Sequence, residues 1–124
     1  MTGARSTILV AEDEHSSLEV LVLLLEAEGY RVIAAEEGLK ALDQLRLEAI
    51  DLVVSDFMMP GLDGLGLCAA MRADARLATI PVLLVSASVN IVVPAGPPVV
   101  ARMQKPLSFD RLLVRVREVL AERT

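Results

Sequence analysis

The sequence has few cysteines, histidines and aromatic residues. It contains one cysteine, one histidine, two phenylalanines, one tyrosine and no tryptophan among 124 residues. The single thiol, Cys68, excludes an internal disulfide framework and is typical of a reducing compartment. We expect Cys68 to be a small buried apolar residue. We expect His15 to lie on the surface in the first turn of a helix, rather than to donate a phosphoryl group or bind a ligand.

The sequence also lacks a basic stripe and a long hydrophobic run. Its formal net charge is -5, and it has no series of Lys and Arg with interleaved aromatics, which argues against direct nucleic-acid binding by this domain. The longest strongly apolar run, Val20 to Leu25, is far shorter than the roughly 20 residues that span a bilayer. Glu12, Asp13 and Glu14 interrupt the N-terminal apolar stretch before a signal-peptide core is complete. We therefore expect a cytoplasmic protein without a membrane segment.

Aliphatic residues are abundant, and they suffice for one domain spanning residues 1–124. Hydrophobic residues make up 54% of the chain, and a chain of this length buries roughly two thirds of its unfolded surface in a single core. Short aliphatic runs alternate with longer amphipathic segments, which predicts an α/β fold in which helices cover a parallel sheet. The predicted strands are 7–11, 30–34, 52–55, 81–85 and 99–103, and the predicted helices are 14–28, 39–47, 65–73 and 108–122.

Individual residues refine these elements. Arg31 and Arg102 interrupt the second and fifth aliphatic runs, which predicts that these two strands lie at the edges of the sheet. Gly29 is placed to end the first helix, and Ser108 to cap the start of the last one. Leu39 begins the apolar stripe that we expect along the second helix.

The segment between the fourth and fifth strands breaks the alternation. A helix is due there, but residues 87–98 contain Pro94, Pro97 and Pro98. A proline inside a helix costs about 3 kcal/mol, so we expect a loop with at most one helical turn. The segment is apolar, which predicts that it packs against the rest of the domain; its apolar residues include Val89, Ile91, Val92 and Val93.

Polar side chains follow four of the predicted strands. Glu12 and Asp13 follow the first strand, Asp56 the third, Ser86 the fourth and Lys105 the fifth. In an open parallel sheet, ligands bind outside the carboxyl ends of the strands, so we expect these side chains to converge.

The expected cluster has the composition of a phosphoryl-transfer site. Carboxylates that lie close together raise each other's pKa unless a cation neutralises them, and an all-oxygen ligand set with few protein donors suits Mg²⁺. A lysine opposite the acids offers a compact positive charge for phosphate oxygens. A carboxylate can itself act as the nucleophile and become an aspartyl phosphate. Taken singly, each of these residues would be read as an ordinary turn, cap or surface residue.

The same residues carry a family resemblance over the whole chain. Glu12-Asp13 after the first aliphatic run, the stretch from Asp56 to Gly64 with Met59-Pro60 and Asp63-Gly64, Ser86-Ala87 and Lys105-Pro106 closely resemble the receiver domain of two-component response regulators. The resemblance implies a flavodoxin-like three-layer sandwich with a five-stranded sheet in the order 2-1-3-4-5. In this chain we expect the fourth helix of that fold to be shortened or replaced by a loop.

The resemblance also implies roles for the acidic residues. Asp56 matches the phosphoacceptor, and Asp13 matches a direct Mg²⁺ ligand. Glu12 would act on the metal directly or through water, and the backbone carbonyl of Met58 would be a further ligand.

Four more positions match residues near the phosphoryl group. Ser86 matches the switch hydroxyl, and Ala87 occupies a position where the family keeps a small residue beside the acceptor. Lys105 matches the lysine that binds phosphate oxygen, and Pro106 matches the structural proline after it, joined through a possible cis bond. We expect Asp63-Gly64 to form a structural turn before the third helix.

Arg102 departs from the family pattern. It stands three residues before Lys105, where the resemblance implies a switch aromatic. A guanidinium cannot fill the apolar slot that the aromatic ring would enter without losing its own partners. We therefore expect intact chemistry at Asp56 but an altered output. Either the 87–98 loop becomes ordered on phosphorylation, or the signal passes through other surfaces such as the first or last helix.

The resemblance implies a phosphoacceptor that receives its phosphoryl group from a histidine kinase or phosphotransferase and catalyses no other reaction. A downstream protein or an effector domain after Thr124 would receive the signal, and a homodimer is left open. The alternative is a pseudo-receiver that binds proteins independently of phosphorylation. A phosphatase or nucleotide-binding enzyme is disfavoured because the chain has no P-loop and Asp56-Phe57-Met58 lacks a second acid.

Overall fold

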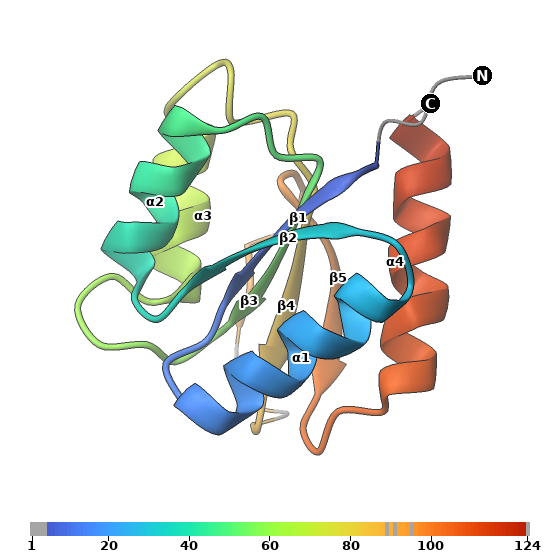
Figure 1. The fold of residues 1–124 in the computed structure, drawn as a ribbon. Helices are drawn as coiled ribbons and strands as arrows, with labels where there is room; N and C mark the ends of the chain where they lie inside the picture. Colours follow the sequence, from blue (N-terminus) through green and yellow to red (C-terminus); the bar gives the residue numbers. More distant parts are fainter. Residues whose placement is uncertain (1–4, 89, 91, 95, 124) are drawn as a thin grey trace.

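A computed structural model describes residues 5–88, 90, 92–94 and 96–123. The sheet consists of five parallel strands in the order β2-β1-β3-β4-β5, as expected from the resemblance. In the described part of the chain, helices α1, α2 and α3 connect successive strands, and α4 follows the last strand (Figure 1). The elements are β1 (Thr7–Ala11), α1 (His15–Ala27), β2 (Arg31–Ala35), α2 (Gly38–Leu47), β3 (Leu52–Asp56), α3 (Gly64–Arg72), β4 (Val82–Ser86), β5 (Val99–Gln104) and α4 (Phe109–Arg123).

The helices cover both faces of the sheet. Helices α2 and α3 lie on one face, and α1 and α4 lie on the other (Figure 1). Successive side chains of a strand point to opposite faces, so Leu9 packs toward α2 and α3 while Ile8 and Val10 pack toward α1 and α4. Because helices cover both faces of the sheet, the sequences of the central strands are nearly continuous aliphatic runs.

The strands that contain Arg31 and Arg102 are the two edges of the sheet, as predicted. Every residue of β1, β3 and β4 is buried, whereas β5 alternates between partly buried and exposed residues. Ala101 and Met103 pack on the α1 and α4 side, and Arg102 is exposed. The edge position therefore explains how a charged residue fits into a strand.

The helix termini follow the predicted signals. The amide of Arg111 donates to Ser108 Oγ at 3.3 Å, which confirms the N-cap of α4. Gly29 has φ 97°, the left-handed conformation expected of a glycine that ends a helix. The prediction for Leu39 is wrong, because this side chain is 57% exposed. The buried stripe of α2 begins one residue earlier, at Gly38, and continues through Ala41, Leu42 and Leu45.

The crossover from β4 to β5 is a loop in the part of the chain that the structure describes. Residues 87, 88, 90, 92–94 and 96–98 contain no helix, in agreement with the effect predicted for the prolines. Val93 packs against the core on the α2 and α3 side, and Pro98 is buried. The expected packing fails at Val92, which is 85% exposed. Val89 and Ile91, for which packing was also expected, lie outside the described residues.

Among the described residues, no helix combines the length and apolar composition needed to cross a membrane.

Candidate functional site

The parallel sheet brings three of the predicted site residues into direct contact. Glu12 follows β1, Asp56 ends β3 and Lys105 follows β5, so all three lie at the carboxyl edge of the sheet. Lys105 Nζ donates to Asp56 Oδ2 at 2.9 Å and to Glu12 Oε1 at 3.1 Å. The ammonium therefore bridges two carboxylates that come from different strands.

Asp13 completes a cluster of three acids. Carboxylate oxygens of Glu12, Asp13 and Asp56 all lie within 4.8 Å of one another. Glu12 and Asp56 are buried, whereas Asp13 is exposed, so the cluster has a buried side and an open side. An all-oxygen donor set that leaves room for water and phosphate oxygens is the kind that Mg²⁺ prefers. The donor set therefore fits Mg²⁺.

The electrostatics of the cluster reflect burial and the bridging ammonium. Burial raises the pKa of Glu12, and this effect outweighs the opposing hydrogen bonds from the Glu14 amide and Lys105. Burial alone would lower the pKa of Lys105, but its hydrogen bonds to Asp56 and Glu12 raise that pKa overall. Lys105 is therefore a persistent cation next to the acids.

Gly64 allows the loop after β3 to pack close to Asp56. Its amide donates to the carbonyl of Phe57 at 2.8 Å, and a Cβ at this position would lie 2.6 Å from the carbonyl oxygen of Asp56. Asp63 caps α3 by accepting from the amide of Gly66 at 2.7 Å. The predicted structural turn at Asp63-Gly64 is thus present, and Gly64 has a further role that sequence reasoning missed.

Gly38 is a second glycine whose role sequence reasoning did not identify. A Cβ on Gly38 would collide with the backbone carbonyl of Leu62. The start of α2 therefore packs directly on the loop that follows the acceptor strand. The sequence carried a signal for this contact, because glycine is an unfavourable residue within a helix.

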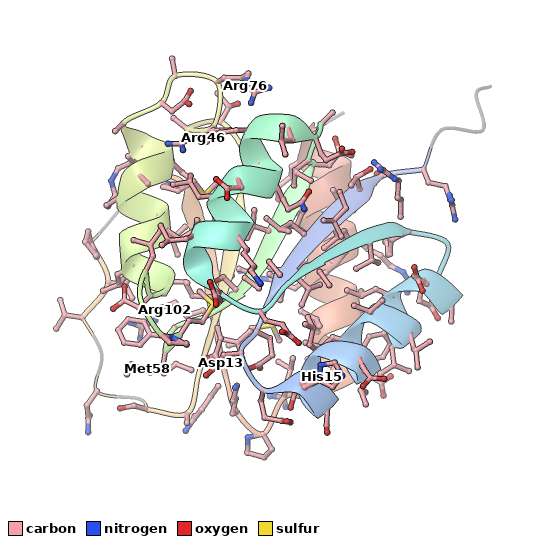
Figure 2. The ribbon with its side chains drawn as sticks, turned by 60° about the vertical axis from the view of Figure 1, so that its left-hand side comes forward. Asp13, His15, Arg46, Met58, Arg76 and Arg102 are labelled. Atoms are coloured by element: carbon pink, nitrogen blue, oxygen red, sulfur yellow. The ribbon has the colours of Figure 1, made fainter. Side chains whose placement is uncertain are left out.

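Three further predicted site residues are Met58, Ala87 and Pro106. Met58 has an exposed side chain and lies at the same end of the molecule as Asp13, opposite Arg46 and Arg76 (Figure 2). Ala87 is exposed. The peptide bond between Lys105 and Pro106 is cis, as the resemblance suggested.

Ser86 ends β4, and its hydroxyl is engaged with nearby backbone. The side chain is buried, with Oγ accepting from the Ser88 amide at 3.0 Å and donating to the Ser88 carbonyl at 3.2 Å. No hydrogen bond joins Ser86 to the acids among the described contacts. Ser86 thus lies at the carboxyl edge of the sheet, and its hydroxyl is directed to the crossover loop.

Arg102 is exposed at the position where the resemblance implied an aromatic residue. It pairs in register with Leu84, and Gln104 pairs with Ser86. Its side chain lies at the same end of the molecule as Met58 (Figure 2). An exposed guanidinium cannot act as a ring that enters an apolar slot, which agrees with the expected departure from the family pattern.

A groove that the sequence did not predict runs from the acids along α1. Its volume is about 440 Å³. Apolar side chains of α1 and of the residues around the start of α4 form its walls, and the groove also contacts Glu12, Asp56 and Lys105. The wall residues include Val20, Leu21, Leu24, Leu107 and Phe109.

Known proteins are similar to this chain over most of its length. The transcriptional regulatory protein CseB of Streptomyces coelicolor is 34% identical over 116 residues, which cover 91% of this chain and 48% of CseB. The first curated relatives are all longer, and the chain spans about a third to a half of their length. The functions of those longer proteins therefore cannot be assigned to this chain from these matches alone.

Solved structures match over nearly the whole fold. The receiver domain of the Francisella response regulator 1452 superposes with a TM-score of 0.85 at 25% identity and covers 97% of this chain and 100% of its own. The response regulator TrrA from Thermotoga maritima, solved in complex with Mg²⁺-BeF, has a TM-score of 0.82 at 29% identity. It covers 92% of this chain and 98% of its own.

The family-level match covers the same region. The response regulator receiver domain family matches residues 8–117, which include the acids, Ser86 and Lys105. On this evidence the chain belongs to the family of response regulator receiver domains.

Proposed function

We propose that Asp56 takes a phosphoryl group from a phosphohistidine on a histidine kinase or phosphotransferase, with Mg²⁺ as the cofactor. The observation that carries the proposal is the contact of Lys105 Nζ with Asp56 Oδ2 at 2.9 Å inside the cluster of three acids. This arrangement brings a carboxylate that could act as a nucleophile, a cation and an oxygen-rich donor set into one small volume. TrrA, a relative of the same fold, was solved with Mg²⁺-BeF bound.

The proposed transfer is a single displacement at phosphorus. A carboxylate oxygen of Asp56 forms a bond to phosphorus while the bond between phosphorus and the donor imidazole nitrogen breaks. The electron pair of that bond leaves with the nitrogen, and a donor ring protonated on its other nitrogen departs as neutral histidine. A later attack of water on phosphorus restores Asp56 and releases inorganic phosphate. The chain would thus catalyse only its own phosphorylation and dephosphorylation.

The other site residues stabilise charge in this scheme. Glu12, Asp13, Asp56 and the carbonyl of Met58 would hold Mg²⁺, which neutralises charge on the phosphoryl oxygens when bound. Lys105 is in contact with Asp56 and would donate to a phosphoryl oxygen. Ser86 ends the neighbouring strand and would supply a hydroxyl donor.

We propose that the output surface differs from the usual one in this family. Two observations support this: the described residues between β4 and β5 form no helix, and Arg102 is exposed where an aromatic residue was implied. A downstream protein or an effector domain would read this surface. Neither observation changes the acids or Lys105.

Intact-mass measurement after incubation with acetyl phosphate and Mg²⁺ tests the transfer. Wild type should gain the mass of one phosphoryl group, and Asp56→Asn should gain none because the nucleophile is gone. Asp110→Asn is a matched control, since Asp110 is exposed in the first turn of α4, and it should be phosphorylated like wild type. An adduct that survives Asp56→Asn would contradict the assignment.

The altered crossover also favours a second candidate function, a pseudo-receiver that binds its partner without phosphorylation. The same assay separates the two functions. The absence of an adduct on folded wild-type protein, with and without Mg²⁺, would support the pseudo-receiver. A stoichiometric adduct on Asp56 would exclude it.

A further inference from the structure

Strand β2 forms one edge of the sheet and presents backbone groups there (Figure 1). The amide of Arg31 and the carbonyl of Ala35 are each hydrogen-bonded on the β1 side, at 3.0 Å. Backbone groups of successive residues in a strand point to opposite sides, so those of Val32 and Ala34 point away from β1. Neither has a backbone hydrogen bond among the contacts that the structure describes outside the strand ladder. Strand β2 therefore offers donors and acceptors to a further strand.

The composition of β2 does not block such pairing. An edge strand is a template for another chain unless a charge, a proline or a covering element prevents the approach. The central residues Val32, Ile33 and Ala34 carry no charge and include no proline. The opposite edge, β5, has the exposed Arg102 near its centre. Of the two edges of the described sheet, β2 is therefore better suited to accept a further strand.

An open apolar groove runs beside the same strand. Its volume is about 530 Å³, and Val22 and Leu23 of α1 line it together with Ala34 of β2. Leu23 is 65% exposed, although it lies in a helix that packs on the sheet. The small side chain of Ala34 leaves room next to Leu23 for an apolar side chain of an added strand. Apolar burial would therefore accompany the backbone pairing at this edge.

We propose that β2 pairs in antiparallel fashion with β2 of a second copy of this chain, so that the two sheets become continuous across a two-fold axis. Ile33 lies opposite the partner's Ile33 at the axis in this register. Val32 lies opposite the partner's Ala34, and each such pair exchanges both of its backbone hydrogen bonds. The interface is isologous and closed, as in most homodimers. This inference does not depend on the proposed phosphoacceptor function.

The charges at the two ends of β2 favour a second copy as the partner. Arg31 begins the strand, Glu36 and Glu37 follow its last residue, and all three are exposed. Antiparallel pairing brings each Arg31 to the end where the acids of the other copy lie, whereas parallel pairing would bring like charges together. Arg31 also contacts Glu48 at 3.0 Å, but Glu37 makes no capping hydrogen bond to α2. Charge complementarity of this kind selects the orientation of the pair more than it adds affinity.

Sedimentation equilibrium and NMR over a range of protein concentrations test the pairing. The average mass should rise from one chain toward two with a Kd of roughly 100 µM, as for a small interface. Amide exchange at Val32 and Ala34 should slow by roughly fivefold at about 1 mM protein, where about a fifth of the chains would remain single. A mixture of isotope-labelled and unlabelled chains should show a contact between the Ile33 Hα atoms of two copies, because this pair is close and not hydrogen-bonded.

Matched variants separate this edge from other surfaces. Ala34→Lys places a charge on each side of the two-fold axis and should weaken association by at least roughly tenfold. Ala27→Lys makes the same substitution at an exposed position on α1 and should associate like wild type. Glu37→Arg should weaken association, and the double variant Arg31→Glu/Glu37→Arg should restore it, because opposite charges then face each other again. Far-UV circular dichroism checks that each variant is folded.

Three results would overturn the proposed pairing. One is the mass of a single chain at every concentration up to about 1 mM. Another is a dimer that Ala34→Lys weakens no more than Ala27→Lys does, which would place the interface on a different surface. The third is a dimer in which exchange at Val32 and Ala34 is unchanged. None of these results bears on the phosphoryl adduct at Asp56, which the intact-mass assay measures separately.

Discussion

Gly64 lies so close to Asp56 that a Cβ at this position would lie 2.6 Å from the carbonyl oxygen of Asp56. Gly64→Ala must therefore displace either the start of α3 or the end of the acceptor strand. We expect a loss of about 1–3 kcal/mol in the free energy of unfolding, as for overpacked interiors. We also expect slower phosphorylation by acetyl phosphate. Urea denaturation and intact-mass kinetics measure the two effects.

Gly66→Ala is the matched control for this prediction. A Cβ on Gly66 would approach Leu62 Cδ1 at 2.5 Å, but that atom ends a flexible side chain and can move away. Alanine also favours the helical conformation by about 1 kcal/mol over glycine. Gly66→Ala should therefore leave both stability and phosphorylation close to wild type. Equal losses in the two variants would contradict a specific role for Gly64.

Removal of the Lys105 ammonium should strengthen Mg²⁺ binding and weaken phosphorylation. Lys105 Nζ holds one oxygen of Asp56 and one of Glu12, so it repels a second cation and competes for its ligands. In Lys105→Met we expect Mg²⁺ to bind roughly tenfold more tightly, an effect of about 1.4 kcal/mol at the site. Isothermal titration calorimetry measures the affinity, and intact mass measures the phosphoryl adduct.

Lys40→Met controls for the loss of one positive charge. Lys40 is exposed on α2 and makes no contact with the acids among the described hydrogen bonds and ion pairs. This variant should bind Mg²⁺ like wild type. Weaker Mg²⁺ binding in Lys105→Met would show that the ammonium supports the metal site rather than competing with it.

The sequence allowed the fold and the edge of the site to be predicted because both depend on short-range patterns. Aliphatic runs with Val and Ile specified the strands, and each acid or lysine stood directly after a run. In a parallel sheet, that position alone brings the side chains to one edge. The contact of Lys105 with both Glu12 and Asp56 is a consequence of this geometry.

Features that depend on contacts between residues far apart in the chain could not be predicted from sequence patterns. Leu39 fits an apolar stripe by spacing, yet Gly38 takes the buried position because α2 must pack on the Leu62 backbone. The hydrogen bonds between Ser86 and Ser88 depend on the path of a loop that no periodicity describes. The groove along α1 arises where side chains of α1 meet residues around the start of α4, which lie far from α1 in the chain.

His15 should make the stability depend on pH. Its ring contacts two exposed carboxylates, with Nδ1 2.8 Å from Glu36 and Nε2 2.7 Å from Glu19. The hydrogen bond to Glu36 is the main cause that raises the pKa of His15 above its usual value of 6.5. A group with a raised pKa stabilises the fold below its unfolded-state value, and this contribution is lost as the pH rises through the folded-state value.

Comparison of wild type with His15→Gln checks this dependence. In Mg²⁺-free buffer, wild type should have the higher urea midpoint at about pH 5.5, and the difference should vanish by about pH 9. Because all three side chains are exposed, we expect the difference to be small and to shrink in high salt. A difference that persists at high pH would show that the ring contributes through packing instead.

Cys68 should resist thiol reagents in the folded protein. Its side chain is fully buried on α3, and burial raises its pKa to about 11. Only the thiolate reacts readily, so the burial of the thiol and its raised pKa both slow modification at about pH 8. Iodoacetamide labelling, followed by intact mass, should therefore be slow in native buffer and complete in urea. Cys68→Ser, which leaves no thiol, should remain unlabelled in both, and rapid labelling of native wild type would contradict the buried position of Cys68.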